Sequence, residues 1–263
     1  MQNLLYATDG SEDAVNAGRF LAFQPFSADM HIHILTVRNP KAPDDSIRIL
    51  AGAVNALARF PGFVTTATAP AETPTEVIAT IDAIATNMGA DLIAVGSRGL
   101  STTPDLLLGS VSGGVARTAT CPVLIAKAPV APLDTMVIGV DGSPESLHAL
   151  HWAIQEIPRP IDSATLIVHA GAPVGDETFA GKDGRNNGLV LAQQIQRKYG
   201  IAAECLWQAG EPSTTLIAVA EKRHAGLIVT GVREIPGIER LAHGSVSERL
   251  LHHAPCCLLI VKR

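Results

Sequence analysis

The sequence has few cysteines and no excess of basic residues. Its four cysteines, in a chain of 263 residues, are too few for a disulfide framework and are typical of a reducing compartment; they are Cys121, Cys205, Cys256 and Cys257. The formal net charge is -5, so the chain lacks the basic surface that neutralises a phosphate backbone. We therefore expect no nucleic-acid partner.

Long hydrophobic runs are also missing. No apolar run reaches the roughly 18 to 20 residues that cross a bilayer. The first residues, "MQNLLYATDGSED", lack the charged and apolar regions of a secretory signal. We therefore expect a cytoplasmic protein without a membrane partner.

The composition that is present favours folding along the whole chain. Hydrophobic residues make up 47% and charged residues 17% of the sequence, unlike the apolar-poor composition of disordered segments. A length of 263 residues exceeds the usual size of one domain and favours two.

The chain contains an internal duplication. "NLLYATDGSEDAVNAGRFLA" at 3–22 matches "TMVIGVDGSPESLHALHWAI" at 135–154, which aligns Asp9 with Asp141 at an offset of 132 residues. "GSVSGGVARTATCPVLIAK" at 109–127 matches "GSVSERLLHHAPCCLLIVK" at 244–262 at an offset of 135. The linker "APVAPLD" at 128–134 separates the copies, which predicts domains at 1–129 and 133–263.

Each copy alternates strands and helices. In the first copy, hydrophobic periodicity predicts strands at 4–8, 31–37, 63–68, 92–95 and 123–126. It predicts helices at 12–23 and 44–59, a helix starting at Pro74, and a helix at 109–119. In the second helix Ile47, Leu50, Val54 and Leu57 share one face. Ser11 and Ser143 follow Asp-Gly and are expected to cap the next helix.

This alternation predicts an α/β fold, with two tandem doubly wound domains that each contain a five-stranded parallel sheet of Rossmann-like type. Strands that are apolar throughout are typical of parallel sheets covered on both faces. In such sheets a ligand binds beyond the carboxyl ends of the strands, where the winding reverses. Asp9 and Gly96 both follow a predicted strand at such an end.

The stretch "GSRGLSTTPDLLLGS" at 96–110 has a spacing that suits a phosphate group. Gly96 and Gly99 allow a positive φ and leave room for an anion beside the backbone amides. Gly109 and Ser110 then begin a helix, whose N-terminus attracts anions. Glycine turns and a serine cap are also ordinary turn chemistry, so neither feature is specific alone.

The combined pattern resembles the universal stress protein family. The spacing Gly-x2-Gly-x9-Gly-Ser after a strand, the preceding "DGS" and the final strand "CPVLIAK" carry this resemblance, which covers nearly the whole chain as two copies. The resemblance implies ATP binding by the first copy, with or without a bound Mg²⁺. It implies that Asp9 and the backbone of Val37 hold the nucleoside, and that Gly96, Gly99, Gly109 and Ser110 hold the ribose and phosphates. Arg98 either offsets phosphate charge or is a solvated loop residue.

The second copy departs from this pattern. It keeps four of the site residues, namely Asp141, Gly231, Gly244 and Ser245, but Glu234 replaces the second glycine. A carboxylate there repels phosphate by about 1 kcal/mol or more, depending on screening. Pairing of Glu234 with Arg233 or Arg240 would relieve the conflict. Nucleotide binding by the second copy is therefore left open, and we expect a degenerate site.

Other motifs in the sequence predict less. "HHAPCC" at 252–257 combines imidazoles and thiols, but adjacent cysteines on a strand point to opposite faces, so we expect no metal site. The chain has no Gly-x-Ser-x-Gly motif and no evident general base, so we expect no enzyme.

The favoured function is a stress-response regulatory protein, in which ATP orders the 97–108 loop for an unknown protein partner. The alternatives are a nucleotide-free scaffold and, less favoured, a slow ATPase.

The final strands of both copies would leave an exposed sheet edge. In the family such strands pair antiparallel between subunits, which implies pairing of Val123 to Ala126 with Leu258 to Val261 inside this chain. The remaining faces leave a homodimer open.

Overall fold

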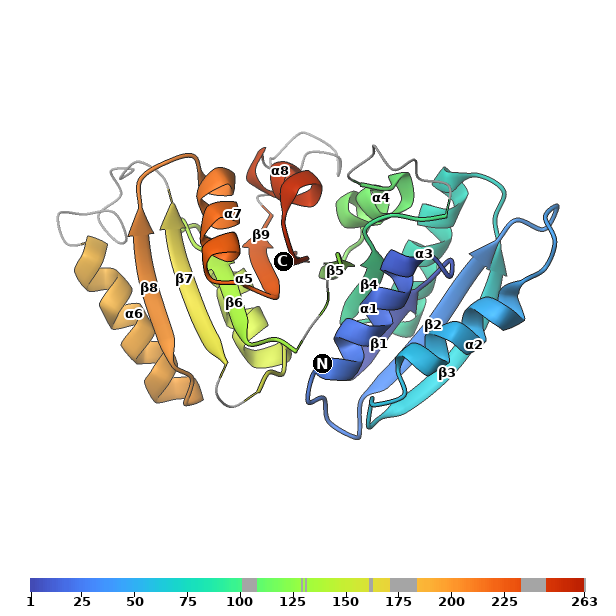
Figure 1. Ribbon diagram of the computed structural model, residues 1–263, viewed down its shortest axis with the longest axis horizontal. Coiled ribbons are helices and arrows are strands. Elements are labelled where there is room, and N and C mark those ends of the chain that lie inside the picture. Colours follow the sequence, from blue (N-terminus) through green and yellow to red (C-terminus); the bar gives the residue numbers. More distant parts are fainter. Residues whose placement is uncertain are drawn as a thin grey trace. The chain divides into compact units, whose positions relative to one another are not determined.

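The protein folds into two compact units, each with its own parallel sheet (Figure 1). The computed structural model describes residues 1–100, 108–128, 130, 132–160, 163–170, 184–232 and 245–262. The described residues of the first unit lie within 1–130, and those of the second within 132–262.

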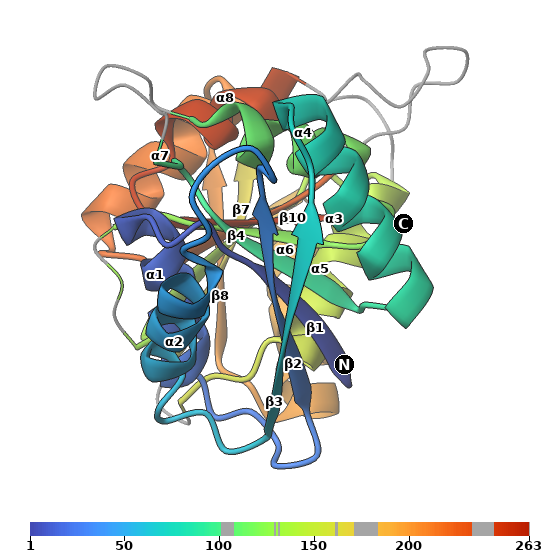
Figure 2. The ribbon, with the colours of Figure 1, turned by 90° about the vertical axis from the view of Figure 1, so that its right-hand side faces the viewer.

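The first unit is a sheet with the strand order β3-β2-β1-β4-β5, in which every pair of neighbours is parallel. Its strands are β1 (Asn3–Ala7), β2 (His31–Arg38), β3 (Phe63–Pro70), β4 (Leu92–Gly96) and β5 (Val123–Ala126). Its helices are α1 (Glu12–Phe23), α2 (Ser46–Ala56), α3 (Pro74–Met88) and α4 (Ser110–Thr118). Figure 2 shows α1 and α2 on one face of this sheet and α3 and α4 on the other.

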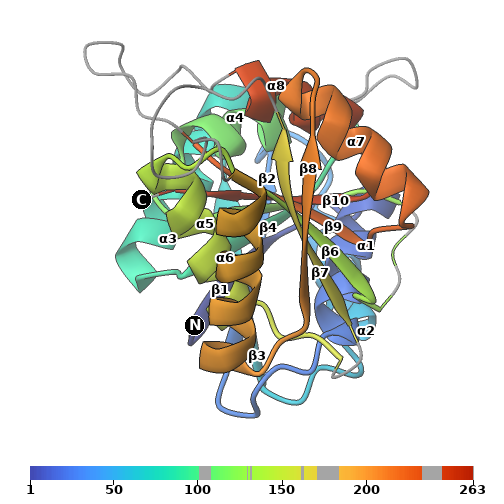
Figure 3. The same ribbon diagram turned by 90° about the vertical axis from the view of Figure 1, so that its left-hand side faces the viewer.

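The second unit repeats this topology, with the order β10-β9-β6-β7-β8 and parallel neighbours throughout. Its strands are β6 (Thr135–Gly139), β7 (Ala164–Ala170), β8 (Ala203–Gln208), β9 (Leu227–Gly231) and β10 (Cys257–Val261). Its helices are α5 (Pro144–Glu156), α6 (Gly184–Tyr199), α7 (Pro212–Lys222) and α8 (Ser245–His253), which flank the sheet in Figure 3. The prediction of two tandem doubly wound five-stranded parallel sheets is confirmed.

Local sequence explains most of these elements. The apolar run of β4 is buried at every position, as expected of a central strand covered on both faces. Ser11 accepts the N–H of Ala14 at the start of α1, and Ser143 accepts the N–H of Ser146 at the start of α5, so both predicted caps are confirmed. Within the described residues, no helix is long and apolar enough to span a membrane.

Helix α2 buries only part of the face that its apolar spacing suggests. Leu57, which follows the helix, is buried as predicted, but Ile47 is 86% exposed and Val54 is 43% exposed, and Ile49 and Ala53 are buried in their place. The orientation follows from the close approach of α1, because a Cβ added to Gly18 would lie 3.0 Å from the Cβ of Ala56. Small residues set the α1–α2 contact, and an apolar stripe of α2 stays open.

Candidate functional site

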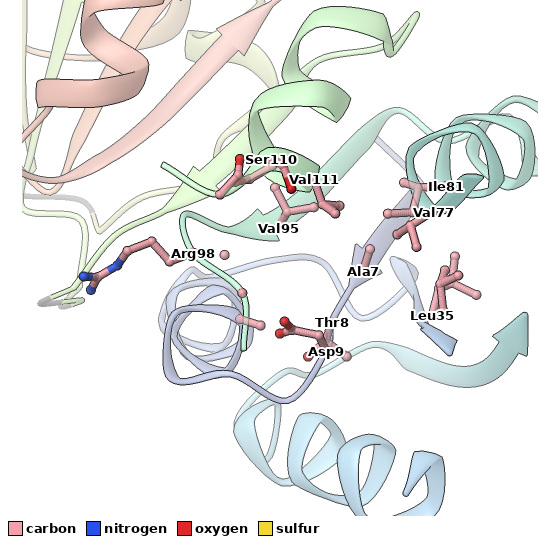
Figure 4. A pocket seen from close by; sticks show the side chains of 16 residues that line it. Ala7, Thr8, Asp9, Leu35, Val77, Ile81, Val95, Arg98, Ser110 and Val111 are labelled. Carbon is pink, nitrogen blue, oxygen red and sulfur yellow. The ribbon is translucent and has the colours of Figure 1, made fainter. Parts of the chain in front are cut away.

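One pocket lies at the carboxyl ends of β1 and β4, where the winding of the first sheet reverses (Figure 4). All seven site residues predicted for the first copy line it, namely Asp9, Val37, Gly96, Arg98, Gly99, Gly109 and Ser110. Apolar side chains form further walls, which sequence reasoning did not identify; they are Ala7, Leu35, Val77, Ile81, Val95 and Val111. The pocket therefore combines an apolar wall with polar backbone and a carboxylate.

The start of α4 supplies hydrogen-bond donors to this pocket. Gly109 is the N-cap residue and has no side chain to accept the N–H groups of the first turn. The N–H of Gly109 itself donates to the carbonyl of Ser97 at 2.8 Å, which anchors the helix start beside β4. Ser110, the first helical residue, is exposed and lines the pocket. Such a helix start presents amides and a partial positive charge to an anion.

The turn after β1 is tied to the residues that follow β4. The carboxylate of Asp9 accepts the N–H of Leu100 at 2.8 Å and the N–H of Ser11 at 3.0 Å. The hydroxyl of Ser11 donates to the carbonyl of Arg98 at 3.0 Å. Residues 98 and 100 are thus held in place by protein contacts alone. The predicted loop continues through 101–107, which lie outside the described residues.

A buried carboxylate that sequence reasoning missed supports this loop. Oδ2 of Asp13 accepts the hydroxyl of Ser97 at 2.6 Å and the Nε–H of Arg98 at 2.9 Å. The Asp13 side chain is only 5% exposed, and its hydrogen bond and charge raise the pKa of Arg98. In Figure 4 the guanidinium of Arg98 points away from the other labelled side chains. In sequence Asp13 looks like an ordinary acidic residue at a helix start, so no local signal singles it out.

The glycines serve close packing rather than positive backbone angles. Gly96 and Gly99 would allow a positive φ, but neither adopts one, and in this turn region only Gly10 does, at 78°. A Cβ on Gly96 would overlap the backbone nitrogen of Ala14, and a Cβ on Gly99 would lie 2.7 Å from Oδ2 of Asp9. The absence of a side chain lets β4 approach α1 and lets the loop approach Asp9.

The second unit has a corresponding pocket. Three residues of its predicted site line that pocket, namely Asp141, Gly231 and Ser245. Gly231 repeats the role of Gly96, since its Cβ would lie 2.5 Å from the carbonyl oxygen of Glu145. Gly244 and Glu234, with Arg233 and Arg240, lie outside the described residues.

The serine hydroxyl that Asp13 binds in the first unit has no equivalent in the sequence of the second. The repeat offsets align Asp13 with Glu145 and Ser97 with Val232. Valine has no hydroxyl to donate, and Glu145 lines the pocket.

Elsewhere in the described chain, no three His, Cys, Asp or Glu side chains are placed to hold a metal ion, the 252–257 segment included.

Comparison with known proteins places both units in one sequence family. The model of the universal stress protein family matches residues 1–127 and 132–262. A universal stress protein of Methanocaldococcus jannaschii is 29% identical over 142 residues, which cover 49% of this chain and 81% of the relative.

A solved structure of nearly the same extent shares the fold. The crystal structure of a universal stress protein from Archaeoglobus fulgidus has a TM-score of 0.71 at 23% identity and covers 99% of this chain and 96% of that chain. A universal stress protein family member from Arabidopsis thaliana with AMP bound has a TM-score of 0.38 at 19% identity and covers 49% of this chain and 91% of that chain.

Proposed function

The chain belongs to the universal stress protein family, and on that premise we propose that its first unit is an ATP-binding regulatory module. The AMP of the Arabidopsis protein is a property of that protein. For this chain the proposal rests on one observation: the glycine-capped start of α4 faces the same pocket as Asp9 and an apolar wall.

Each part of a nucleotide has a counterpart in this pocket. The apolar walls, with Leu35 and Ile81, suit the base, and the backbone of Val37, which lines the same pocket, is the proposed partner of the nucleoside. The carboxylate of Asp9 suits a ribose hydroxyl or an adenine amino group. The amide of Ser110, at the start of α4, suits a phosphate oxygen, and Gly109 leaves room for the phosphate beside it. Mg²⁺, when present, would be held mainly by the phosphates.

We propose that the second unit is degenerate as an ATP site. Two carboxylates, Asp141 and Glu145, line its pocket, and its sequence has Glu234 where the motif requires glycine. Negative side chains near a triphosphate reduce affinity by Coulomb repulsion. ATP is therefore expected to bind with a stoichiometry of one per chain.

We also propose that regulation, rather than catalysis, is the role of the bound nucleotide. Among the described lining residues of the first pocket, Asp9 is the one carboxylate, and backbone amides of Ser11 and Leu100 already engage it. A base so occupied is poorly placed to activate water. A protein partner that distinguishes the nucleotide-bound loop from the empty one would complete the regulatory role.

The test uses one charge at the start of α4. Ser110→Asp keeps a residue that suits the first turn of a helix but places a negative charge where the phosphates would lie. We expect it to weaken ATP binding at least about tenfold in calorimetry and to weaken adenosine binding much less. Ser245→Asp, at the matching position of α8, is the control and should leave ATP affinity unchanged.

Each outcome separates the candidate functions. Absence of ATP binding by the unaltered chain, with and without Mg²⁺, would favour the nucleotide-free scaffold. Equal ATP affinity of the unaltered chain and Ser110→Asp would refute the proposed phosphate position. Turnover of ATP well above the spontaneous rate, abolished by Asp9→Asn, would favour the ATPase.

A further inference from the structure

The outer strand of the first sheet, β3, lies open along one edge. It ends the strand order β3-β2-β1-β4-β5 of its unit, and all eight of its residues are exposed or partly exposed. Phe63 at its start is 65% exposed. In Figure 1, β3 and α2 lie at the rim of the sheet of this unit.

The hydrogen bonds of β3 show which of its backbone groups face outward. The N–H of Phe63 donates to Met30 at 2.9 Å, and the N–H of Ala71 donates to Arg38 at 3.0 Å. Along a parallel strand, alternate residues direct both backbone groups to the same neighbour. Odd-numbered residues therefore face β2, and the outward row comprises Val64, Thr66 and Thr68.

This edge lacks the usual protection against pairing with another strand. Exposed edges are normally blunted by charged side chains, bulges or internal prolines, but "FVTTATAP" carries no charge and has its proline at the last position. The outer strand of the second unit, β8, differs, because its Glu204 pairs with Arg223 at 3.0 Å. The unprotected edge is a particular feature of the first unit.

An apolar stripe on α2 lies on the same side as this edge. Ile47, Leu50 and Val54 form the stripe, and none of them is fully buried. The side chain of Ala56 points toward α1. Because successive residues of an α-helix are rotated by about 100° around its axis, the stripe lies on the flank opposite Ala56. The α2 helix packs over β2 and β3, so the flank away from α1 points toward the open edge.

We propose that two copies of this chain associate by pairing their β3 strands antiparallel about a two-fold axis at Thr66. In this register Thr66 exchanges both backbone hydrogen bonds with its counterpart, and Val64 exchanges both with Thr68 of the other copy. Phe63 falls opposite Ala69 of the other copy, so its exposed ring is covered. Pro70, which has no N–H, ends the ladder.

A second copy fits this surface better than an unrelated extended peptide. The register is self-complementary, and the uncharged strand brings no like charges together. A copy also brings a second α2 stripe to the axis together with its β3 edge, whereas a peptide would supply only the backbone ladder. The proposal does not depend on ATP binding, because Thr66 is not among the residues that line the nucleotide pocket.

The proposal is tested by sedimentation velocity of the full chain over a range of concentrations. We expect a dimer whose dissociation constant rises about tenfold or more in Thr66→Lys, which sets two ammonium groups against each other at the axis. Ile47→Asp should have a similar effect. Gln208→Lys, an exposed change on β8, is the control and should leave the dimer intact.

Hydrogen exchange supplies a second readout that needs no variant. The amides of Val64, Thr66 and Thr68 should be protected in the dimer and should exchange quickly in dilute monomer. A monomer at every soluble concentration would overturn the proposal. So would a dimer that persists in a Thr66→Lys protein whose circular dichroism matches that of the unaltered chain.

Discussion

Asp13 on α1 holds Arg98 beyond β4, with Oδ2 accepting the Nε–H at 2.9 Å. The same oxygen accepts the hydroxyl of Ser97 at 2.6 Å. One buried carboxylate thereby fixes the first residues of the loop that leads to the start of α4. Residues 97 and 98 are thus held by protein contacts, so less ordering of this part of the site remains to be done on binding.

Removal of that carboxylate should affect both stability and binding. Asp13→Ala leaves the Ser97 hydroxyl without its acceptor, and we expect the free energy of unfolding to fall by about 1–3 kcal/mol. ATP affinity should fall as well, since the loop loses its support. Urea denaturation and calorimetry provide the measurements. Glu12→Ala removes an exposed carboxylate from the same helical turn and should change neither quantity appreciably.

The close packing at Gly96 makes a sharp prediction about glycine replacements. Gly96→Ala forces a methyl group against the backbone of α1, and overpacking of this kind costs about 1–3 kcal/mol. Gly52→Ala places the same group on an exposed part of α2, with no atom within 4 Å, and should stabilise the protein by about 0.5–1 kcal/mol. The midpoint temperatures of thermal unfolding of the two variants should therefore shift in opposite directions relative to the unaltered protein. A shift in the same direction would contradict the packing role of Gly96.

Glu211 makes stability depend on acid pH. Burial raises the pKa of this N-cap residue of α7, but hydrogen bonds from Ser213 and Thr214 outweigh that effect and lower the pKa to about 2, from an ordinary value of 4.5. Because the folded-state pKa is depressed, the stabilisation is present above pH 4.5 and is lost as the pH falls toward 2. Glu211→Gln should be less stable than the unaltered protein at neutral pH, and this gap should close on acidification. Urea unfolding at several pH values measures the gap, and Glu221→Gln serves as a control with an exposed carboxylate.

Tyr6 provides a test at alkaline pH. Burial raises the pKa of its phenol to about 12, and the hydroxyl donates to the carbonyl of Ala14 at 2.6 Å. The ultraviolet absorbance of phenolate should therefore show a step near pH 12 that is missing in Tyr6→Phe. The raised pKa means that its contribution to stability is complete below pH 10 and is lost as the pH rises toward 12. A full phenolate signal near pH 10 in the folded protein would contradict the burial of Tyr6.

Much of the fold could be predicted from local pattern. Helix α1 occupies 12–23 as expected, and its apolar positions Ala14, Ala17 and Leu21 are buried. Helix α2 shows where such reasoning stops. Its apolar spacing suggested one face, but contact with α1 through small residues turned Ile49 and Ala53 inward. Periodicity shows that a helix has an apolar side, whereas the neighbouring elements decide which side is covered.

Some residues of the candidate site could likewise be predicted from the sequence, and others could not. The seven residues predicted for the first copy share one pocket, because strand ends and a helix start meet at the winding reversal of a parallel sheet. Their role in nucleotide binding stays a prediction, as does the pairing of Val123 to Ala126 with Leu258 to Val261. Asp13 was missed because its partners lie 84 and 85 residues away along the chain.

The sequence by itself determined the duplication, the alternation of strands and helices, and the positions of the glycines and caps, because these depend on neighbours a few residues apart. Only the tertiary structure decided that Gly96 serves contact with α1, that Asp13 holds Arg98, and that β3 and one flank of α2 stay open. Those features depend on segments that are distant in the sequence and that folding brings together, so local spacing of residues cannot predict them.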